Sequence, residues 1–149
     1  MLDRLSSLET FGIKLGLENI SRLCEALGHP ERSFATLHVA GTNGKGSVTA
    51  MVHAALRAAG LRTARYTSPH LADITERFVI GDMPVDTATF NTVAHDVLDL
   101  ADRLVATKVL KVLPTFFEAT TAIAFELFRR AGTEMAVIEV GRASCRERV

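Results

Sequence analysis

The sequence has few of the features that mark secreted or zinc-bound proteins. It contains only two cysteines, Cys24 and Cys145, and they lie far apart in the chain. Such a pair suggests no disulfide framework and fits a reducing cytoplasm. The five histidines form neither an H-E-x-x-H motif nor a cluster with cysteine. A structural zinc site is therefore not expected.

An excess of one charge and a long apolar run are missing as well. The formal net charge is zero, which gives no electrostatic footprint for nucleic acid or for an anionic membrane surface. No apolar run approaches the roughly 20 residues that a membrane-spanning helix needs. The first residues include an early acid, Asp3, and no long apolar core, unlike a secretory signal. We expect a cytoplasmic protein without nucleic-acid or membrane partners.

The segments that are present alternate between short apolar strands and amphipathic helices. This alternation indicates an α/β domain with a parallel sheet. The spacing of apolar residues and the turn residues predict a hairpin around Gly81-Asp82. They also predict helices over 18–27, over 47–59, after Asp86 and over 115–130, and strands over 35–41, 63–66 and 135–140.

The stretch "HVAGTNGKGSVTA", His38 to Ala50, lies between a predicted strand and a predicted helix. It departs from the standard phosphate loop, because Val39 stands where the first glycine belongs and Gly46 separates Lys45 from Ser47. Glycines let backbone N–H groups converge on phosphate, and a helix N-terminus adds partial positive charge. We predict a phosphate loop in which Lys45 contacts the β/γ-phosphates. The alternative is a tight turn with an exposed lysine.

This stretch resembles the variant phosphate loop of the Mur-ligase-type ATP-dependent amide ligases. In particular it is similar to the folylpolyglutamate synthase/dihydrofolate synthase family, because Lys-Gly-Ser is typical of the folate branch and Lys-Thr-Thr of the cell-wall ligases. The stretches "YTSPHL", with "ERF" just after it, "PTFFEATTAIAFELF" and "VIEVG" agree in order and spacing. The resemblance covers roughly Phe11 to Gly141.

The resemblance implies a P-loop Mur-ligase-type central ATPase domain, with a parallel sheet flanked by helices. The implied activity joins L-glutamate to dihydropteroate or reduced folates, through an acyl phosphate formed from ATP. ATP and Mg²⁺ are the implied cofactors, and a monomer is expected at full length. A cell-wall Mur-type ligase and a non-catalytic nucleotide-binding module are the alternatives.

The resemblance also assigns residues to roles. Lys45 is the catalytic residue, and Ser68 and Glu139 match magnesium ligands. The implied nucleotide-binding residues are Gly41, Thr42, Asn43, Gly44, Lys45, Gly46 and Ser47. The implied substrate-binding residues are Gly12, Ile13, Lys14, Leu15, Thr115, Phe116, Phe117 and Glu118.

Several of these residues have a simpler interpretation. Ser68 is also suited to a turn before Pro69, and Glu139 to a buried salt bridge. Glu118 completes a helix-capping box with Thr115. Alternatives also stay open for four further residues: Phe116 and Phe117 as core, Lys14 as a solvated charge and His70 as a surface histidine. For Arg77 we expect a solvated charge.

The last nine residues, "GRASCRERV", are polar, basic and without periodicity. They match one reading frame of a common sequencing adapter. We expect residues 1–140 to be an incomplete N-terminal ATP-binding domain and 141–149 a non-native tail, with the C-terminal ligase domain absent and the chain inactive by itself. An unpaired apolar sheet edge should remain, and the helices from Val48 and from Phe116 should each expose part of their apolar faces.

Overall fold

The computed structural model describes residues 1–11 and 16–139. A five-stranded sheet of order β1-β5-β2-β3-β4 forms its centre. Strands β1, β5 and β2 run parallel, and β3 and β4 continue the sheet as an antiparallel hairpin. The predicted α/β class is confirmed, as is the hairpin at Gly81-Asp82. The strands are β1 (Ala35–Val39), β2 (Thr63–Tyr66), β3 (Phe78–Ile80), β4 (Met83–Pro84) and β5 (Met135–Glu139).

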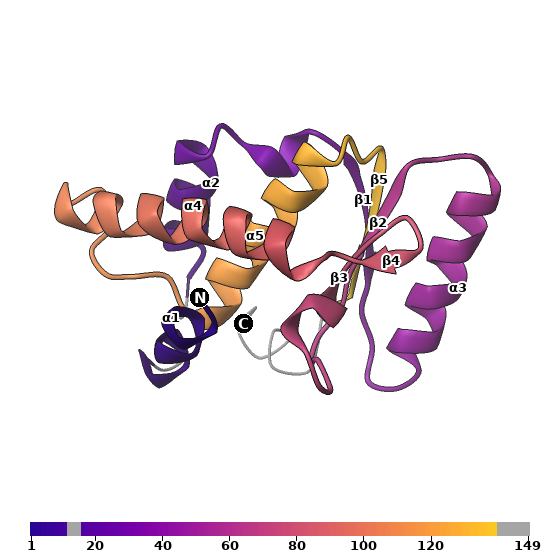
Figure 1. Cartoon of the computed structure of the whole chain (residues 1–149). Coiled ribbons are helices and arrows are strands. Elements are labelled where there is room, and N and C mark those ends of the chain that lie inside the picture. Colours follow the sequence, from indigo (N-terminus) through magenta and orange to yellow (C-terminus); the bar gives the residue numbers. More distant parts are fainter. Residues whose placement is uncertain (12–15, 140–149) are drawn as a thin grey trace.

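Helices cover both sides of this sheet (Figure 1). Helix α3 covers one face alone, and α5 lies on the other face with α4 and α2 packed on it. The α-helices are α1 (Leu2–Ser7), α2 (Glu18–Ala26), α3 (Lys45–Ala58), α4 (Thr87–Ala106) and α5 (Phe116–Arg130), and the short 3-10 helices are η1 (Leu8–Phe11), η2 (Pro30–Arg32) and η3 (Ile74–Arg77).

Side-chain caps mark the beginnings of α4 and α5, the two long helices on the side of the sheet opposite α3. Asp86 accepts a hydrogen bond from the backbone N–H of Thr89 at 2.8 Å, which caps α4. Thr115 caps α5 in the same way, with its hydroxyl accepting from the backbone N–H of Glu118. Both caps satisfy N–H groups that have no partner within the helix.

Helix α5 is the most buried helix, contrary to our expectation for the helix from Phe116. Nine of its residues are buried, from Glu118 to Phe128. The reason is that α2 and α4 pack across the side that faces away from the sheet. The core beside it includes the ring of Tyr66, stacked 5.5 Å from that of Phe78, which lies 5.4 Å from Phe90.

The edge strand β1 and helix α3 agree with the expectation that one sheet edge is unpaired and that apolar side chains stay exposed. Strand β1 is an edge of the sheet, and none of its five residues is fully buried. Helix α3 exposes Val48 and Met51, the latter with 64% of its surface accessible. Exposed apolar side chains therefore remain on β1, at Leu37, and on α3.

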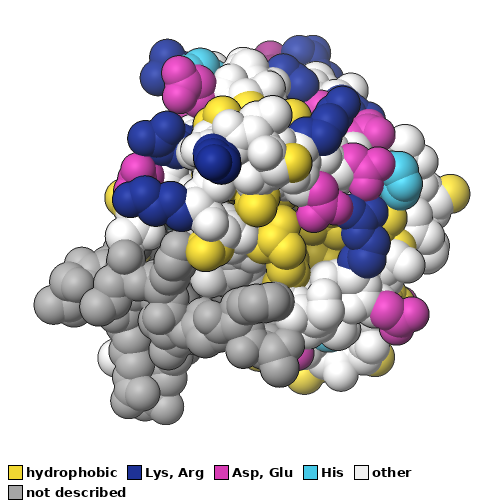
Figure 2. Space-filling view, turned by 90° about the vertical axis from the view of Figure 1, so that its left-hand side faces the viewer, with side chains coloured by type: hydrophobic (Ala, Val, Ile, Leu, Met, Phe, Trp, Pro, Cys, Tyr) yellow, Lys and Arg dark blue, Asp and Glu magenta, His cyan; other side chains and the backbone are white. Residues whose placement is uncertain are grey.

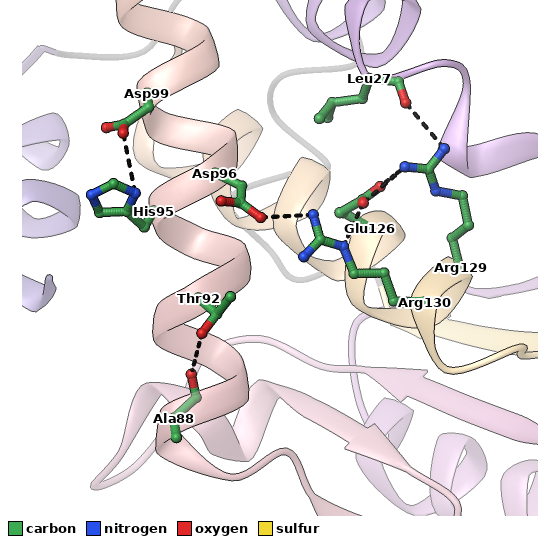
Figure 3. Close-up of polar contacts among 9 residues, drawn as sticks. All are labelled: Leu27, Ala88, Thr92, His95, Asp96, Asp99, Glu126, Arg129 and Arg130. Atoms are coloured by element: carbon green, nitrogen blue, oxygen red, sulfur yellow. Dashed lines mark hydrogen bonds and ion pairs between the residues drawn. The ribbon is translucent and has the colours of Figure 1, made fainter.

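A network of charged side chains joins α4 to α5 (Figure 3). The carboxylate of Glu126 is only 2% exposed, and it pairs with Arg129 at 2.6 Å and with Arg130 at 2.7 Å. Arg130 also reaches Asp96 of α4 at 2.8 Å, and Arg129 donates to the carbonyl oxygen of Leu27. The buried carboxylate is thus neutralised by two guanidinium groups.

The surface carries both signs of charge. In Figure 2, Lys and Arg side chains alternate with Asp and Glu side chains around a band of apolar ones. This mixture agrees with the zero net charge of the sequence. Within residues 1–11 and 16–139, every helix is too short or too polar to span a bilayer.

Candidate active site

The phosphate loop predicted from the sequence connects β1 to the first turn of α3. Gly44 is the residue before the helix, and its φ of 71° lies in the left-handed region that side chains other than glycine rarely adopt. The side chain of Lys45 turns back, so that Nζ donates to the carbonyl oxygen of Gly41 at 2.8 Å. The loop is therefore a compact turn with its residues at the surface.

The start of α3 can receive an anion. The first intrahelical hydrogen bond of this turn runs from the N–H of Val48 to the carbonyl of Gly44. The N–H groups of Lys45, Gly46 and Ser47 precede it and have no carbonyl partner within the helix. Together with the helix dipole and the lysine charge, they can bind phosphate oxygens. The nucleotide-binding role of residues 41–47 stays a prediction.

Sheet pairing brings the predicted metal ligands to the same edge as this loop. Val39, the last residue of β1, is opposite Glu139 in the parallel register, and Tyr66 at the end of β2 is opposite Ile138. Ser68 follows Tyr66 by two residues. The carboxyl ends of parallel strands meet at one edge of a sheet, where α/β proteins bind their ligands. Ser68 and Glu139 are therefore at the same edge of the sheet as the phosphate loop, in the order loop, Glu139, Ser68 across the strands.

Glu139 is a buried carboxylate with 8% of its surface accessible. Within residues 1–11 and 16–139, no Lys or Arg side chain lies within ion-pair distance of it, so these residues do not support the buried salt bridge. The same part of the chain holds no group of three or more His, Cys, Asp or Glu side chains suited to a metal. The metal-binding role of Ser68 and Glu139 stays a prediction.

The N-terminus of α5 carries the second predicted substrate segment. The Glu118 carboxylate accepts a hydrogen bond from the backbone N–H of Thr115 at 2.8 Å, and the reciprocal bond completes the capping box. The capping interpretation is thus confirmed. Phe116 and Phe117 are half-buried.

Glu118 also contributes to a cavity of about 230 Å³ beside α5. Its wall includes Gly16 and Leu17, which follow the predicted substrate segment Gly12, Ile13, Lys14 and Leu15. Those four residues lie outside the described part of the chain. Lys108 and Lys111 from the loop before α5 line the same cavity. The cavity therefore adjoins the predicted substrate segment at the start of α5. The substrate-binding role of both predicted segments stays a prediction.

Arg77 was expected to be a solvated charge, and this expectation is wrong. Its side chain is 8% exposed, with Nε donating to Nδ1 of His70 at 2.9 Å and the guanidinium 5.2 Å from the ring centre of Phe116. The local sequence carries no signal for this burial, which depends on packing against the distant Phe116. Arg77 links the loop after β2 to the first residue of α5.

Curated relatives identify the family. A probable dihydrofolate synthetase of Schizosaccharomyces pombe is 39% identical over 129 residues, which is 87% of this chain and 30% of the relative. A dihydrofolate synthase/folylpolyglutamate synthase of Mycobacterium tuberculosis is 40% identical over 130 residues, 84% of this chain and 27% of the relative. This chain belongs to the folylpolyglutamate synthase/dihydrofolate synthase family. No protein-family model matches it.

Solved structures of folylpolyglutamate synthases have the same fold. The Lactobacillus casei enzyme superposes with a TM-score of 0.85 at 33% identity, over 96% of this chain and 36% of that one. The Mycobacterium tuberculosis synthase complexed with ADP gives 0.84 at 36% identity, over 94% and 32% of the two chains. A bifunctional synthase with Mn, AMPPNP and L-glutamate bound gives 0.77 at 33% identity, over 92% and 32%. Our chain spans about a third or less of these family members.

Proposed function

We propose that the full-length protein is an ATP-dependent ligase that forms an amide between L-glutamate and the carboxylate of dihydropteroate, of a reduced folate, or of both. The observation that carries this proposal is the meeting of the glycine-rich loop, Lys45 and buried Glu139 at one edge of a parallel sheet. The relatives reported above are folate ligases, which favours this substrate class over cell-wall precursors.

The chemistry that this arrangement suits is phosphoryl transfer to a carboxylate. A carboxylate is a poor electrophile, and phosphorylation supplies a leaving group that the amine of glutamate can displace. Positioning and charge neutralisation account for most of the catalysis in such transfers. Lys45 and the N–H groups at the start of α3 would hold the transferred phosphate.

The residues fit a divalent metal ion, for which we propose Mg²⁺. Glu139 is buried, and the described residues give it no cationic partner, so its environment suits a bound cation. Ser68 supplies an oxygen from the neighbouring strand end, and hard cations prefer oxygen ligands. The ion would neutralise phosphate charge. Further ligands would come from other parts of the protein.

The organisation of the chain is also part of this proposal. Residues 1–140 would form part of an ATP-binding domain, 141–149 would be a non-native tail, and a C-terminal ligase domain would complete the enzyme. Met1–Val149 alone would then bind ATP weakly and release no ADP in a folate-dependent way. We further propose that the enzyme is a cytoplasmic monomer.

Isotope transfer tests the proposed reaction. Full-length enzyme is given dihydropteroate with both carboxylate oxygens labelled with ¹⁸O, together with ATP and glutamate. If the carboxylate attacks the γ-phosphate, the inorganic phosphate released carries one ¹⁸O atom per amide formed. Amide formation with unlabelled phosphate would contradict activation by phosphorylation.

A further inference from the structure

Arg77 is a buried residue, and its guanidinium lacks a carboxylate partner among the described residues. Among the described residues, the guanidinium contacts the ring nitrogen of His70 and the face of Phe116, both of them neutral groups. A buried charge is usually paired, because removal from water is unfavourable. The chain meets this requirement at Glu126, which pairs with Arg129 and Arg130 (Figure 3). The charge of Arg77 is therefore available for an anion that the described residues do not provide.

The hydrogen bond from Arg77 also fixes the proton of His70. Arginine is always protonated and only donates, so Nδ1 of His70 must be the acceptor in the 2.9 Å contact. The neutral ring then carries its proton on Nε2. His70 is half-buried, so part of this residue reaches the surface of the molecule.

Both residues belong to the predicted active-site edge of the sheet. His70 lies two residues beyond Ser68, in the loop that follows β2. The backbone N–H of Thr67 donates to the carbonyl oxygen of Arg77 at 3.0 Å, which holds the start of that loop against the end of η3. Phe116, below the guanidinium, is the first residue of α5 and belongs to a predicted substrate segment.

We propose that Arg77 and His70 form an anion site that binds the carboxylate of the substrate to be ligated. The remaining guanidinium N–H groups and Nε2–H of His70 supply the donors, and Phe116 supports the guanidinium from its other side. This inference rests on the proposed function, because it names two residues that position the carboxylate of the same reaction. Arginine suits the role, since its planar donors match a carboxylate.

Replacing Arg77 by methionine separates this role from a structural one. Arg77→Met keeps most of the side-chain volume and removes a buried charge that has no described ionic partner. In the full-length enzyme it should leave the melting temperature equal or higher and raise KM for the acceptor about tenfold or more, as loss of a charged hydrogen bond does. The KM for ATP should stay within about twofold. A lower melting temperature with an unchanged acceptor KM would overturn the proposal, as would a change confined to the KM for ATP.

Arg129→Met is the matched control. It also removes a guanidinium, but from a buried carboxylate, Glu126. It should lower the melting temperature and leave both KM values unchanged. If Arg129→Met raised the acceptor KM as much as Arg77→Met does, the effect would be general destabilisation, and the proposal would be wrong.

Two substitutions of His70 test the role of its Nε2–H group. His70→Asn keeps an acceptor where Nδ1 lies and loses the Nε2 donor, whereas His70→Gln keeps a donor near Nε2 and loses the contact with Arg77. We expect His70→Asn to raise the acceptor KM without lowering the melting temperature. We expect the acceptor KM of His70→Gln to be lower than that of His70→Asn. Wild-type kinetics in His70→Asn would show that His70 does not touch the substrate.

A direct binding measurement tests this inference independently of the ligase reaction. Calorimetric titration of full-length protein with dihydropteroate and ATP requires no turnover. If wild type binds dihydropteroate and Arg77→Met binds it at least tenfold more weakly, the anion site is supported. This holds even if no amide forms and the proposed function fails. Equal affinity in both proteins overturns the inference, even if the wild type is an active ligase. Absence of binding to wild type overturns it as well.

Discussion

Lys45 and Gly41 are joined by a hydrogen bond across the phosphate loop, from the ammonium group to a carbonyl oxygen 2.8 Å away. The lysine thus closes the loop on itself. To contact the β/γ-phosphates its ammonium group must exchange this carbonyl for phosphate oxygens. The exchange is favourable, because a charged acceptor forms a stronger bond with an ammonium group than a neutral one does.

Lys45→Ala should therefore affect turnover far more than stability. The contact with Gly41 is exposed, so its loss should lower the free energy of unfolding by about 1 kcal/mol or less. Loss of the phosphate-binding charge should lower kcat of the full-length enzyme by roughly a hundredfold or more. Steady-state kinetics and urea unfolding measure the two effects, with Arg32→Ala as an exposed-cation control. Turnover within a few-fold of wild type would exclude the role assigned to Lys45.

Glu139→Gln distinguishes a metal ligand from half of a salt bridge. The amide keeps the size of the side chain but removes the charge that holds a cation, so the concentration of Mg²⁺ needed for half-maximal activity should rise strongly. The free energy of unfolding, measured without metal, should be unchanged or slightly higher, since no described cation loses its partner. A destabilisation of about 3 kcal/mol or more would instead indicate a buried ion pair.

Thr115→Ala should destabilise the protein by about 1 kcal/mol, because the hydroxyl that caps α5 is lost. Glu118→Gln should be much milder, since glutamine also completes a capping box. Denaturant unfolding of both variants measures this difference. If Glu118→Gln raises the acceptor KM at unchanged stability, Glu118 contacts the substrate as well as capping the helix.

His53 makes stability depend on pH. Burial, and then the positive charges of Arg65 and Arg57, lower its pKa in the folded protein, where Nε2 lies 3.0 Å from the hydroxyl oxygen of Thr63. The unfolded chain, with an ordinary histidine pKa near 6.5, binds the proton more readily. This contribution to stability is complete above about pH 6.5 and is lost as the pH falls below it.

We expect His53→Gln to weaken the loss of stability between about pH 7 and pH 5. Melting temperatures across that range, compared with those of wild type, measure the effect. His95→Gln is the control, because His95 is exposed and its partner, Asp99, lies on the same helix. An equally steep pH dependence in wild type and His53→Gln would exclude His53 as its source.

Local residue patterns predicted most of the elements but not how they pack. Asp86, Thr115 and the glycines after β1 act within a few residues of themselves, so the sequence shows where α3, α4 and α5 begin. The insertion of β5 between β1 and β2 joins segments that are roughly 70 to 100 residues apart in the sequence. Burial of α5 by α2 and α4 is equally non-local, and the apolar pattern of α5 alone cannot reveal it.

The candidate site likewise combines features that are local in the sequence with contacts between distant segments. The phosphate loop is continuous in sequence, and it could be predicted together with its lysine. The contact of Arg77 with Phe116 spans two separate segments, and a charged residue next to a short strand is usually solvated. Its burial follows from the packing of the loop after β2 against α5. The resemblance to a known family supplied Ser68 and Glu139, whose spacing in sequence does not by itself indicate a shared site.

The most direct test of the proposed function is ADP release by the full-length enzyme, with each substrate omitted in turn. ATP, Mg²⁺, L-glutamate and either dihydropteroate or a reduced folate are supplied, and ADP and the new amide are quantified together. The proposed ligase predicts one ADP per amide, with little ADP when the folate-type acceptor, glutamate or Mg²⁺ is left out. Equal ADP release without the acceptor, or ADP release without amide formation in the complete mixture, would contradict it.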